Sequence, residues 1–311
     1  MRQLPYRFSR KTQTLRAAAL ALLPALTGAR LPPAAAGADD AAARGAYLAA
    51  TAGCSQCHTA ERGAPYAGGR VLETRFGAVV TPNITPDRRT GIGGWSAADF
   101  AQAMRWGIAP DDSRYLPAFP FPFYNRLEPR DLADLKAFLD RLPAVSRVNR
   151  AVAPQPFAAA RGAVAVLAMD LPGPWRPDPG KGAVWNRGAY LVATIGRCGD
   201  CHTPRNWLGA LDPDRVLAGG IDGEGHAAPD ITPDAAAGIG RWSLGDIVTL
   251  LEDGQKPDFD FVGGAMGEVV KSTAGLDDAD RRAIAIYLKS LPPIGSSATG
   301  SPQKARSSKK D

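Results

Sequence analysis

The strongest constraint on the fold of this 311-residue chain is a five-residue pattern, Cys-x-x-Cys-His, that occurs twice. The two copies use all four cysteines of the chain: Cys54, Cys57 and His58 in the first, Cys198, Cys201 and His202 in the second. This spacing is typical of covalent haem attachment, because two thioether bonds hold the porphyrin while the adjacent His ligates the iron. A thioredoxin-like redox pair or a zinc site would leave the repeated His unexplained. The pattern therefore predicts two haem c groups, with His58 and His202 as proximal iron ligands.

The first residues predict export. Five Lys or Arg residues lie within the first 16 positions, an apolar stretch follows at 17–25, and small residues run to position 38. This order is typical of a secretory signal peptide, and the apolar run is shorter than the roughly 20 residues that a transmembrane helix needs. We expect a signal peptide at 1–38, cleavage near Ala38, a periplasmic location, and no transmembrane segment in the mature chain.

The charge distribution changes once that segment is set aside. Residues 1–38 contain six Lys or Arg and no acidic residue, and the whole chain has a formal net charge of +6, so the remainder is close to neutral. No basic surface typical of nucleic-acid binding is predicted. Residues 295–311 are rich in Ser, Gly and basic residues, which predicts a disordered basic tail.

Between these segments the chain repeats itself, which indicates two homologous domains. Arg-Gly-Ala-Tyr-Leu at 44–48 returns at 187–191, and Pro-Asn-Ile-Thr-Pro-Asp at 82–87 returns as Pro-Asp-Ile-Thr-Pro-Asp at 229–234. We expect an all-α fold of two tandem domains, each wrapped around one haem c, at residues 39–143 and 187–294.

Within each copy we expect a first helix that leads to the haem motif, a Gly- and Pro-rich loop, a middle helix and a last helix. Ser96 is the predicted cap of the middle helix in the first copy. The segment at 144–186 contains an apolar helical stretch at 157–169 followed by several prolines, so we expect an ordered Pro-rich connecting strap with one helix.

The second axial ligand of each iron decides whether a haem is closed for electron transfer or open to chemistry. Met266, within Gly-Gly-Ala-Met-Gly on a predicted loop, is the expected distal ligand of the second haem. Met266 follows Trp242 by 24 residues, and the residue 24 positions after Trp95 is Phe119, which cannot bind iron.

The candidate distal ligand of the first haem is therefore Met104, with packing in the core as an equal alternative and Met169 as a more distant one. His226, the one His outside the two motifs, is interpreted as a solvent-facing loop residue.

These motifs amount to a family resemblance. From about residue 44 to residue 294 the chain resembles the multihaem c-type cytochrome subunits of periplasmic alcohol and gluconate dehydrogenases. The resemblance rests on both haem motifs, both Ile-Thr-Pro-Asp segments, Trp-Asn-Arg-Gly-Ala-Tyr-Leu at 185–191, and the Met266 segment that leads to Tyr-Leu-Lys-Ser-Leu-Pro-Pro at 287–293. It implies class I cytochrome c domains that accept electrons from a dehydrogenase. Those subunits usually carry three haems, and many of them have Met where this chain has Phe119.

The sequence thus predicts a periplasmic dihaem cytochrome c that relays electrons from a partner dehydrogenase to a cytochrome, an oxidase or a quinone-linked acceptor of the respiratory chain. It is expected to be an electron-transfer subunit of an oxidoreductase complex, because the sequence shows no evident catalytic nucleophile, no pair of catalytic bases and no second cofactor site. The alternative is a dihaem enzyme, acting as a peroxidase or in thiosulfate oxidation, or a gas-binding cytochrome. Each of these would use an open first haem.

Overall fold

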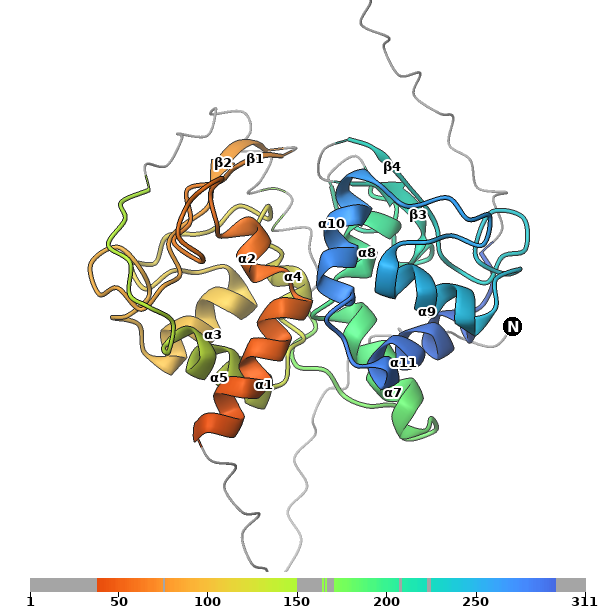
Figure 1. Ribbon diagram of the computed structural model, residues 1–311, viewed down its shortest axis with the longest axis horizontal. Helices are drawn as coiled ribbons and strands as arrows, with labels where there is room; N and C mark the ends of the chain where they lie inside the picture. Colours follow the sequence, from red (N-terminus) through yellow and green to blue (C-terminus); the bar gives the residue numbers. More distant parts are fainter. Residues whose placement is uncertain are drawn as a thin grey trace, which may run out of the picture. The chain divides into compact units, whose positions relative to one another are not determined.

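The computed structural model describes residues 38–74, 76–149, 164, 166, 171–206, 209–222 and 225–294. Its first half contains seven elements (Figure 1): α1 (Ala38–Thr51), α2 (Cys54–Cys57), β1 (Val71–Thr74), β2 (Gly77–Val80), α3 (Ala97–Trp106), α4 (Phe121–Tyr124) and α5 (Pro129–Leu139). The second half repeats this order: α7 (Ala183–Ala193), α8 (Cys198–His202), β3 (Ala218–Ile221), β4 (Ala227–Asp230), α9 (Leu244–Asp253), α10 (Gly264–Thr273) and α11 (Asp278–Lys289).

Several predictions fall where the structure describes little or nothing. The signal peptide at 1–38, the basic tail at 295–311 and Met169 lie outside the described residues, apart from Ala38 at the start of α1. The helix expected at 157–169 also lies outside them, except for Val164 and Val166. No helix in the part of the chain that is described is long and apolar enough to cross a membrane.

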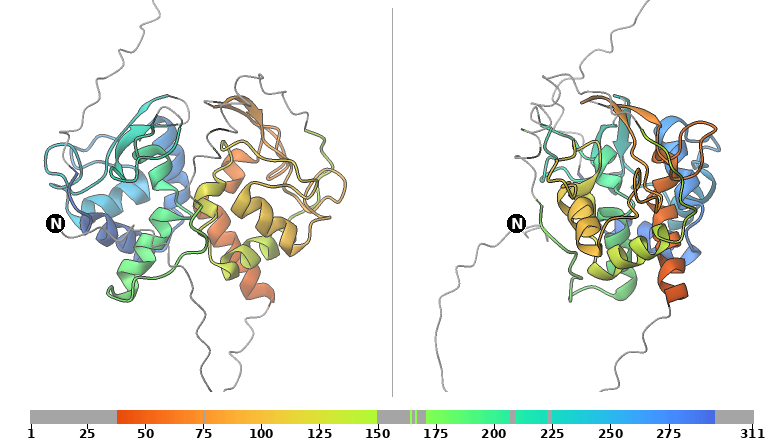
Figure 2. Two further views of the ribbon diagram at one scale, coloured as in Figure 1. Left: turned by 180° about the vertical axis from the view of Figure 1, so that it is seen from behind. Right: turned by 90° about the vertical axis from the view of Figure 1, so that its left-hand side faces the viewer.

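The first and last helices of each half pack against each other at a point where only glycine fits. A Cβ atom on Gly45 in α1 would lie 1.9 Å from the carbonyl oxygen of Asp134 in α5, and one on Gly188 in α7 would lie 1.9 Å from that of Ala283 in α11. Because the two backbones touch at this crossing, the Gly of each Arg-Gly-Ala-Tyr-Leu motif is a packing requirement. The α1–α5 and α7–α11 pairs can be followed from two further sides in Figure 2.

Both middle helices begin at a serine, and the start of the first is the one that the sequence predicts. The side chain of Ser96 accepts a hydrogen bond from the backbone N–H of Asp99, whose carboxylate accepts one from the backbone N–H of Ser96. This capping box satisfies backbone donors at the start of α3, and Ser243 and Asp246 form the same arrangement at α9. The predicted Ser96 cap is confirmed.

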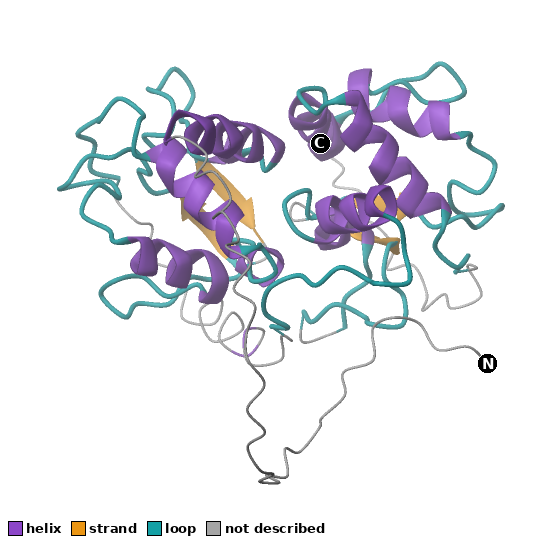
Figure 3. Ribbon diagram, turned by 90° about the horizontal axis from the view of Figure 1, so that it is seen from below, coloured by secondary structure: helices purple, strands orange, loops and turns teal. Residues whose placement is uncertain are grey.

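Two β-hairpins modify the expected all-α architecture. β1 pairs antiparallel with β2, with Val71 opposite Val80, and β3 pairs with β4, with Ala218 opposite Asp230. Figure 3 shows the strands in orange as separate two-stranded sheets among the helices. They occupy the segments expected to be loops. Strands of only four residues, three of which contain Gly or Ala, give little alternation of apolar and polar residues.

The described ends of the connecting segment are bonded to the helical halves. The backbone carbonyl of Val145 accepts a hydrogen bond from the side chain of Asn83, and the backbone N–H of Trp175 donates to the carbonyl of Arg126. The ring of Trp175 packs edge-on against Tyr190, with 6.2 Å between ring centroids. The first helix of the second half begins at residue 183, four residues before the expected domain boundary at 187, because it includes the Ala-Val-Trp-Asn segment that precedes the repeated motif.

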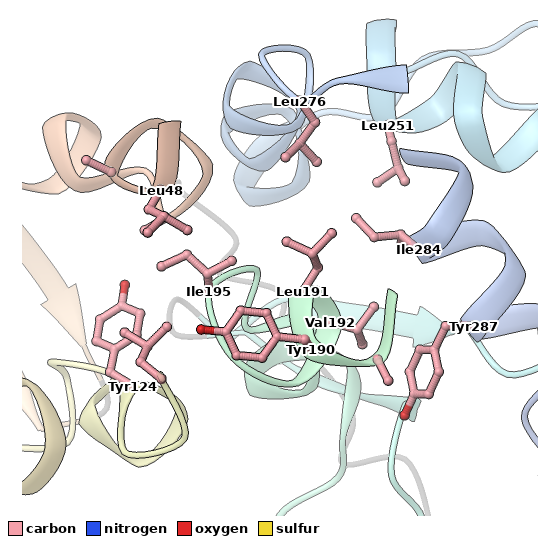
Figure 4. Packing of buried hydrophobic residues seen from close by; sticks show 14 of the residues in the cluster. Leu48, Tyr124, Tyr190, Leu191, Val192, Ile195, Leu251, Leu276, Ile284 and Tyr287 are labelled. Carbon is pink, nitrogen blue, oxygen red and sulfur yellow. The ribbon is translucent and has the colours of Figure 1, made fainter. Parts of the chain in front are cut away.

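Many of the buried apolar residues form one cluster that includes both halves. Figure 4 shows residues such as Leu48 and Tyr124 from the first half, and Leu191 and Ile195 from the second. Each of these four side chains is at most 5% exposed. The two halves therefore share apolar packing, although each also has its own helix pair.

Two tyrosines, one from each Arg-Gly-Ala-Tyr-Leu motif, bond reciprocally between the halves. The hydroxyl of Tyr47 in α1 donates to Oδ2 of Asp280 in α11 at 2.7 Å and accepts from the backbone N–H of Asp277 at 3.2 Å. The hydroxyl of Tyr190 in α7 donates to Oδ2 of Asp131 in α5 at 2.5 Å and accepts from the N–H of Glu128 at 3.2 Å. The tyrosine of each motif therefore bonds to the start of the last helix of the other half.

Candidate haem-attachment sites

The first motif lies on a short helical turn that directly follows α1. Gly53, at φ 66° and ψ 32°, turns the chain between α1 and α2, and the N–H of His58 donates to the carbonyl of Cys54 at 2.9 Å. Since Cys54 and Cys57 are three residues apart on this turn, their sulfur atoms lie on the same face. This is the spacing that two thioether bonds to one porphyrin edge require.

The proximal histidine of the first motif is oriented by a backbone carbonyl. Nδ1 of His58 lies 2.9 Å from the carbonyl oxygen of Pro82. A carbonyl accepts only, so Nδ1 carries the proton and donates it, which leaves the lone pair of Nε2 for a metal. Burial lowers the pKa of His58, so the imidazole is held in the neutral form that binds iron.

The second motif has the same local geometry. Arg197 precedes α8 with φ 52° and ψ 30°, and Nδ1 of His202 lies 2.7 Å from the carbonyl oxygen of Pro229. Burial lowers the pKa of His202 as well. The two histidines are therefore prepared in the same tautomer by equivalent proline carbonyls.

The roles of Pro82 and Pro229 were missed by the sequence reasoning. The signal that could have found them is the repeated Pro-x-Ile-Thr-Pro-Asp segment, whose first proline stands 24 residues after His58 and 27 residues after His202. A backbone carbonyl has no side-chain signature. Only the recurrence of the segment downstream of each haem motif could indicate that the chain returns to the histidine there.

The cysteine environments disfavour a thioredoxin-like redox pair. Burial raises the pKa of the Cys54 thiol to about 12 and that of the Cys198 thiol to about 11. Redox-active cysteines need a lowered pKa, because the thiolate is the reactive form. Within the described residues no group of three or more His, Cys, Asp or Glu side chains gathers to hold a metal ion. Two thiols that can form thioether bonds and one carbonyl-oriented imidazole per motif are what haem c needs, so the residues fit this group.

Met266 lies in the first turn of α10 and not on the loop that the glycines predicted. The glycines instead form the start of this helix: Gly263 is its N-cap, and Gly264 has a φ of 55°. A Cβ atom on either residue would have no heavy atom within 4 Å, so open space borders the backbone just before Met266. Met266 itself is half-buried. Its role as a distal ligand stays a prediction.

The first half places an aromatic cluster at the equivalent position. The bridges between Ile108 and Arg114 and between Gln255 and Phe261 occur at the same offset in both halves, so Phe119 corresponds to Met266. The ring of Phe119 packs against Tyr115, with centroids 5.6 Å apart, and against Tyr124, with centroids 5.7 Å apart. Phe119, at the centre of this cluster, has no atom that can bind iron.

Met104 lies on α3 within the shared apolar cluster. Its side chain is 9% exposed, and its counterpart Leu251 on α9 is 7% exposed in the same cluster. Both readings of Met104, as a core residue and as the distal ligand of the first haem, remain predictions.

His226 is confirmed as a solvent-facing residue. It is exposed in the loop between β3 and β4, and its Nδ1 lies 3.3 Å from Oδ2 of Asp222.

Comparisons with known proteins give a consistent result. The family model for cytochrome c matches residues 42–143. A protein of Cereibacter sphaeroides described as diheme cytochrome c-type is 43% identical over 275 residues, which cover 83% of this chain and 88% of that protein. The cytochrome c subunit of the alcohol dehydrogenase (quinone) of Komagataeibacter europaeus is 38% identical and covers 90% of this chain, but only 62% of its own length is matched.

The fructose dehydrogenase cytochrome subunit of Gluconobacter japonicus is 37% identical over 80% of this chain and 52% of its own length. This chain therefore spans between about half and two thirds of the two dehydrogenase subunits, and most of the dihaem protein. Together with the paired haem motifs and their histidine geometry, these similarities show that the chain belongs to the cytochrome c family, with a dihaem c-type cytochrome and cytochrome subunits of dehydrogenases among its relatives.

Proposed function

We propose that this protein is a dihaem electron carrier that accepts electrons one at a time from a partner dehydrogenase and passes them to the respiratory chain. The acceptor is a cytochrome, an oxidase or a quinone-linked protein. The observation that carries the proposal is the equivalent preparation of His58 and His202, each with Nδ1 bonded to a proline carbonyl. Cytochrome subunits of two dehydrogenases among the relatives support a dehydrogenase as the partner.

In this proposal each half of the chain is a tandem class I cytochrome c domain with one haem c. Cys54 and Cys57 hold the first haem and Cys198 and Cys201 the second, while His58 and His202 ligate the two irons. Met266 is the distal ligand of the second iron, and Met104 is the candidate for the first. The domains occupy residues 39–143 and 187–294, joined by the Pro-rich strap at 144–186.

The residues of the chain would do three things for such a carrier. When bound, haem c supplies an iron that alternates between the ferrous and ferric states. The cysteines fix its position, so no cofactor is lost between electron transfers. The proline carbonyls hold the imidazole rings in one orientation, which limits the rearrangement that accompanies each change of oxidation state. The partial burial of each motif shields its histidine from water and lowers the pKa of that histidine.

Export to the periplasm is part of the same proposal. The basic, apolar and small-residue segments at 1–38 support a signal peptide with cleavage near Ala38. Association with a membrane would then depend on the dehydrogenase or the acceptor.

A second candidate function rests on Phe119. If neither Met104 nor another residue closes the first iron, the first haem could react with peroxide or bind a gas. Such a protein would be a dihaem enzyme or a gas-binding cytochrome. The dehydrogenase subunits among the relatives favour the relay.

One measurement tests both candidates. Haem is quantified in the purified holoprotein, and the carbon monoxide difference spectrum of the fully reduced sample is recorded. The relay predicts two haems per chain and no carbon monoxide binding, because both irons are closed. Binding by about half of the haem would identify an open first iron and place Met104 in the core.

Assays of electron transfer separate the two candidates further. The reduced holoprotein should be oxidised by a c-type cytochrome or oxidase and should show no peroxide turnover with a reduced donor. Rapid peroxide turnover by the protein alone would contradict the relay.

A further inference from the structure

Arg197 adopts a backbone conformation that ordinarily belongs to glycine. It directly precedes Cys198, with φ 52° and ψ 30°. The equivalent residue of the first half, directly before Cys54, is Gly53, with φ 66° and ψ 32°. The left-handed region is unfavourable for a residue with a long side chain, and such strain is typical of functional positions. The second half therefore has an arginine at a position where the first half has glycine, the residue that this backbone conformation favours.

The side chain of Arg197 reaches the haem motif of the first half. Its Nη2 donates to the carbonyl oxygen of Ala52 at 3.3 Å, and Ala52 stands two residues before Cys54. Its guanidinium lies over the ring of the buried Tyr124, 5.9 Å from the ring centroid. A second contact between the halves lies close by, where Nε2 of Gln56 donates to Oγ of Ser272 at 2.9 Å. Arg197 thus joins the turns that precede the two pairs of cysteines.

The positive charge of Arg197 is not neutralised by a direct carboxylate partner. Among the ion pairs of the described residues none includes Arg197, and its Nε is buried without a hydrogen-bond partner. Asp200, the acid of the second motif, is bonded to Arg205 instead. An unpaired charge in a half-buried site acts over a longer distance than an exposed one, because little water screens it.

This charge is felt at both motifs. Burial raises the pKa of the Cys54 and Cys198 thiols, and Arg197 opposes that increase at both residues, one in each half. The geometry agrees, because Arg197 directly precedes Cys198 and its Nη2 bonds to the carbonyl oxygen of Ala52, two residues before Cys54. A single cation therefore lies beside both motifs.

We propose that Arg197 is a positioning residue shared by the two haem sites, whose positive charge raises the reduction potential of both haems while its hydrogen bond holds the two attachment turns together. The physical reason is that an oxidised haem iron carries one more positive charge than a reduced one, so a nearby cation favours the reduced form. The inference rests on the proposed function, because it requires a haem on each motif.

The test is a potentiometric titration of the holoprotein, followed by absorption, for the variants R197Q, R197G and R197K. At a fixed ambient potential, R197Q and R197G should shift the ratio of reduced to oxidised haem toward the oxidised form by at least about threefold at both haems. R197K keeps the charge and should stay close to the wild type. R197G removes the backbone strain but also the hydrogen bond to Ala52, so these two effects on stability oppose each other while both potentials should fall.

Arg205→Gln is the matched control. Arg205 pairs with Asp200 and interacts with Cys201 of the second motif. Loss of Arg205 should therefore shift the reduction potential of the second haem more than that of the first. Loss of Arg197 should shift both.

The outcomes separate this proposal from the proposed function. Unchanged potentials in R197Q and R197G, with two haems attached, would overturn the role of Arg197, and an effect on one haem alone would overturn its shared character. A wild-type protein with fewer than two haems would instead refute the dihaem assignment. If R197Q fails to mature, the comparison of R197G with R197K tests the role of Arg197, since glycine fits this backbone and lysine preserves the charge.

Discussion

Replacing Gly45 or Gly188 with alanine should separate the helix pair that each glycine allows to touch. An added Cβ atom would lie 1.9 Å from a backbone carbonyl oxygen of the facing helix in both cases. It would also lie 2.8 Å from Cβ of Phe138 in the first half and 2.9 Å from Cβ of Tyr287 in the second. Non-bonded carbon and oxygen atoms rarely approach within about 3 Å, so the helices must move apart by about 1 Å or more.

The expected magnitude follows from two opposing terms. Overpacking of a dense interior costs about 1–3 kcal/mol, and here the obstacle is backbone, which cannot rotate away. Alanine in place of glycine in a helix returns up to about 1 kcal/mol. We therefore expect G45A and G188A to lower the free energy of unfolding by about 1–2 kcal/mol each.

Gly245 offers a matched control in the same fold. It is an exposed residue in α9, where an added Cβ would meet nothing closer than Oγ of Ser243 at 3.5 Å. G245A should therefore raise stability by up to about 1 kcal/mol. The assay is denaturant unfolding of the holoprotein, followed by circular dichroism and by haem absorption. Wild-type stability in G45A and G188A, or a gain equal to that of G245A, would refute the close-crossing argument.

Three further predictions follow from single residues. Met266→Ala should lower the potential of the second haem and leave the first unchanged, and unaltered potentials in a redox titration would remove Met266 as a ligand. Burial raises the pKa of Asp280, but hydrogen bonds from Arg187 and Tyr47 outweigh this effect and hold that pKa below its ordinary value. Its contribution to stability is then complete above about pH 4 and is lost as the pH falls through the lower folded-state pKa, so Asp280→Asn should flatten the acid limb of the stability profile. Asn83 is 3% exposed and its amide bonds both Thr85 and Val145, so Asn83→Ala should cost about 2 kcal/mol in denaturant unfolding, and an unchanged midpoint would contradict this.

The sequence predicted those features of the fold that local patterns determine. The Ser96 cap, the last helix of each half and the repeat of the whole element order follow from capping residues and helical spacing. The hairpins were not predicted, because strands of four residues carry too little alternation to be recognised. The start of α10 was missed for a related reason, since glycines on both sides of Met266 favour a loop by propensity and the helix forms despite them.

Features that depend on long-range contacts could not be predicted. The proline carbonyls that orient His58 and His202 belong to the backbone. Every residue has a backbone carbonyl, so the residue type does not indicate which one will bond to a histidine. The position of Arg197 beside both motifs depends on how the two halves meet, and the repeat alone does not contain this information. The sequence did reveal the asymmetry, since Phe119 and Met266 occupy equivalent positions.

The reciprocal bonds of Tyr47 and Tyr190 have the pattern of an isologous dimer, in which residue i of one copy contacts residue j of the other and the converse also holds. Two identical copies of one ancestral domain could form the same pair of bonds. In such a homodimer every substitution would occur at both sites simultaneously. Covalent joining of the copies removes that restriction, so one half can have Arg197 where the other has Gly53, and one can have Phe119 where the other has Met266. Fusion into one polypeptide therefore allows a symmetric contact to hold together two halves whose haem motifs have different surroundings.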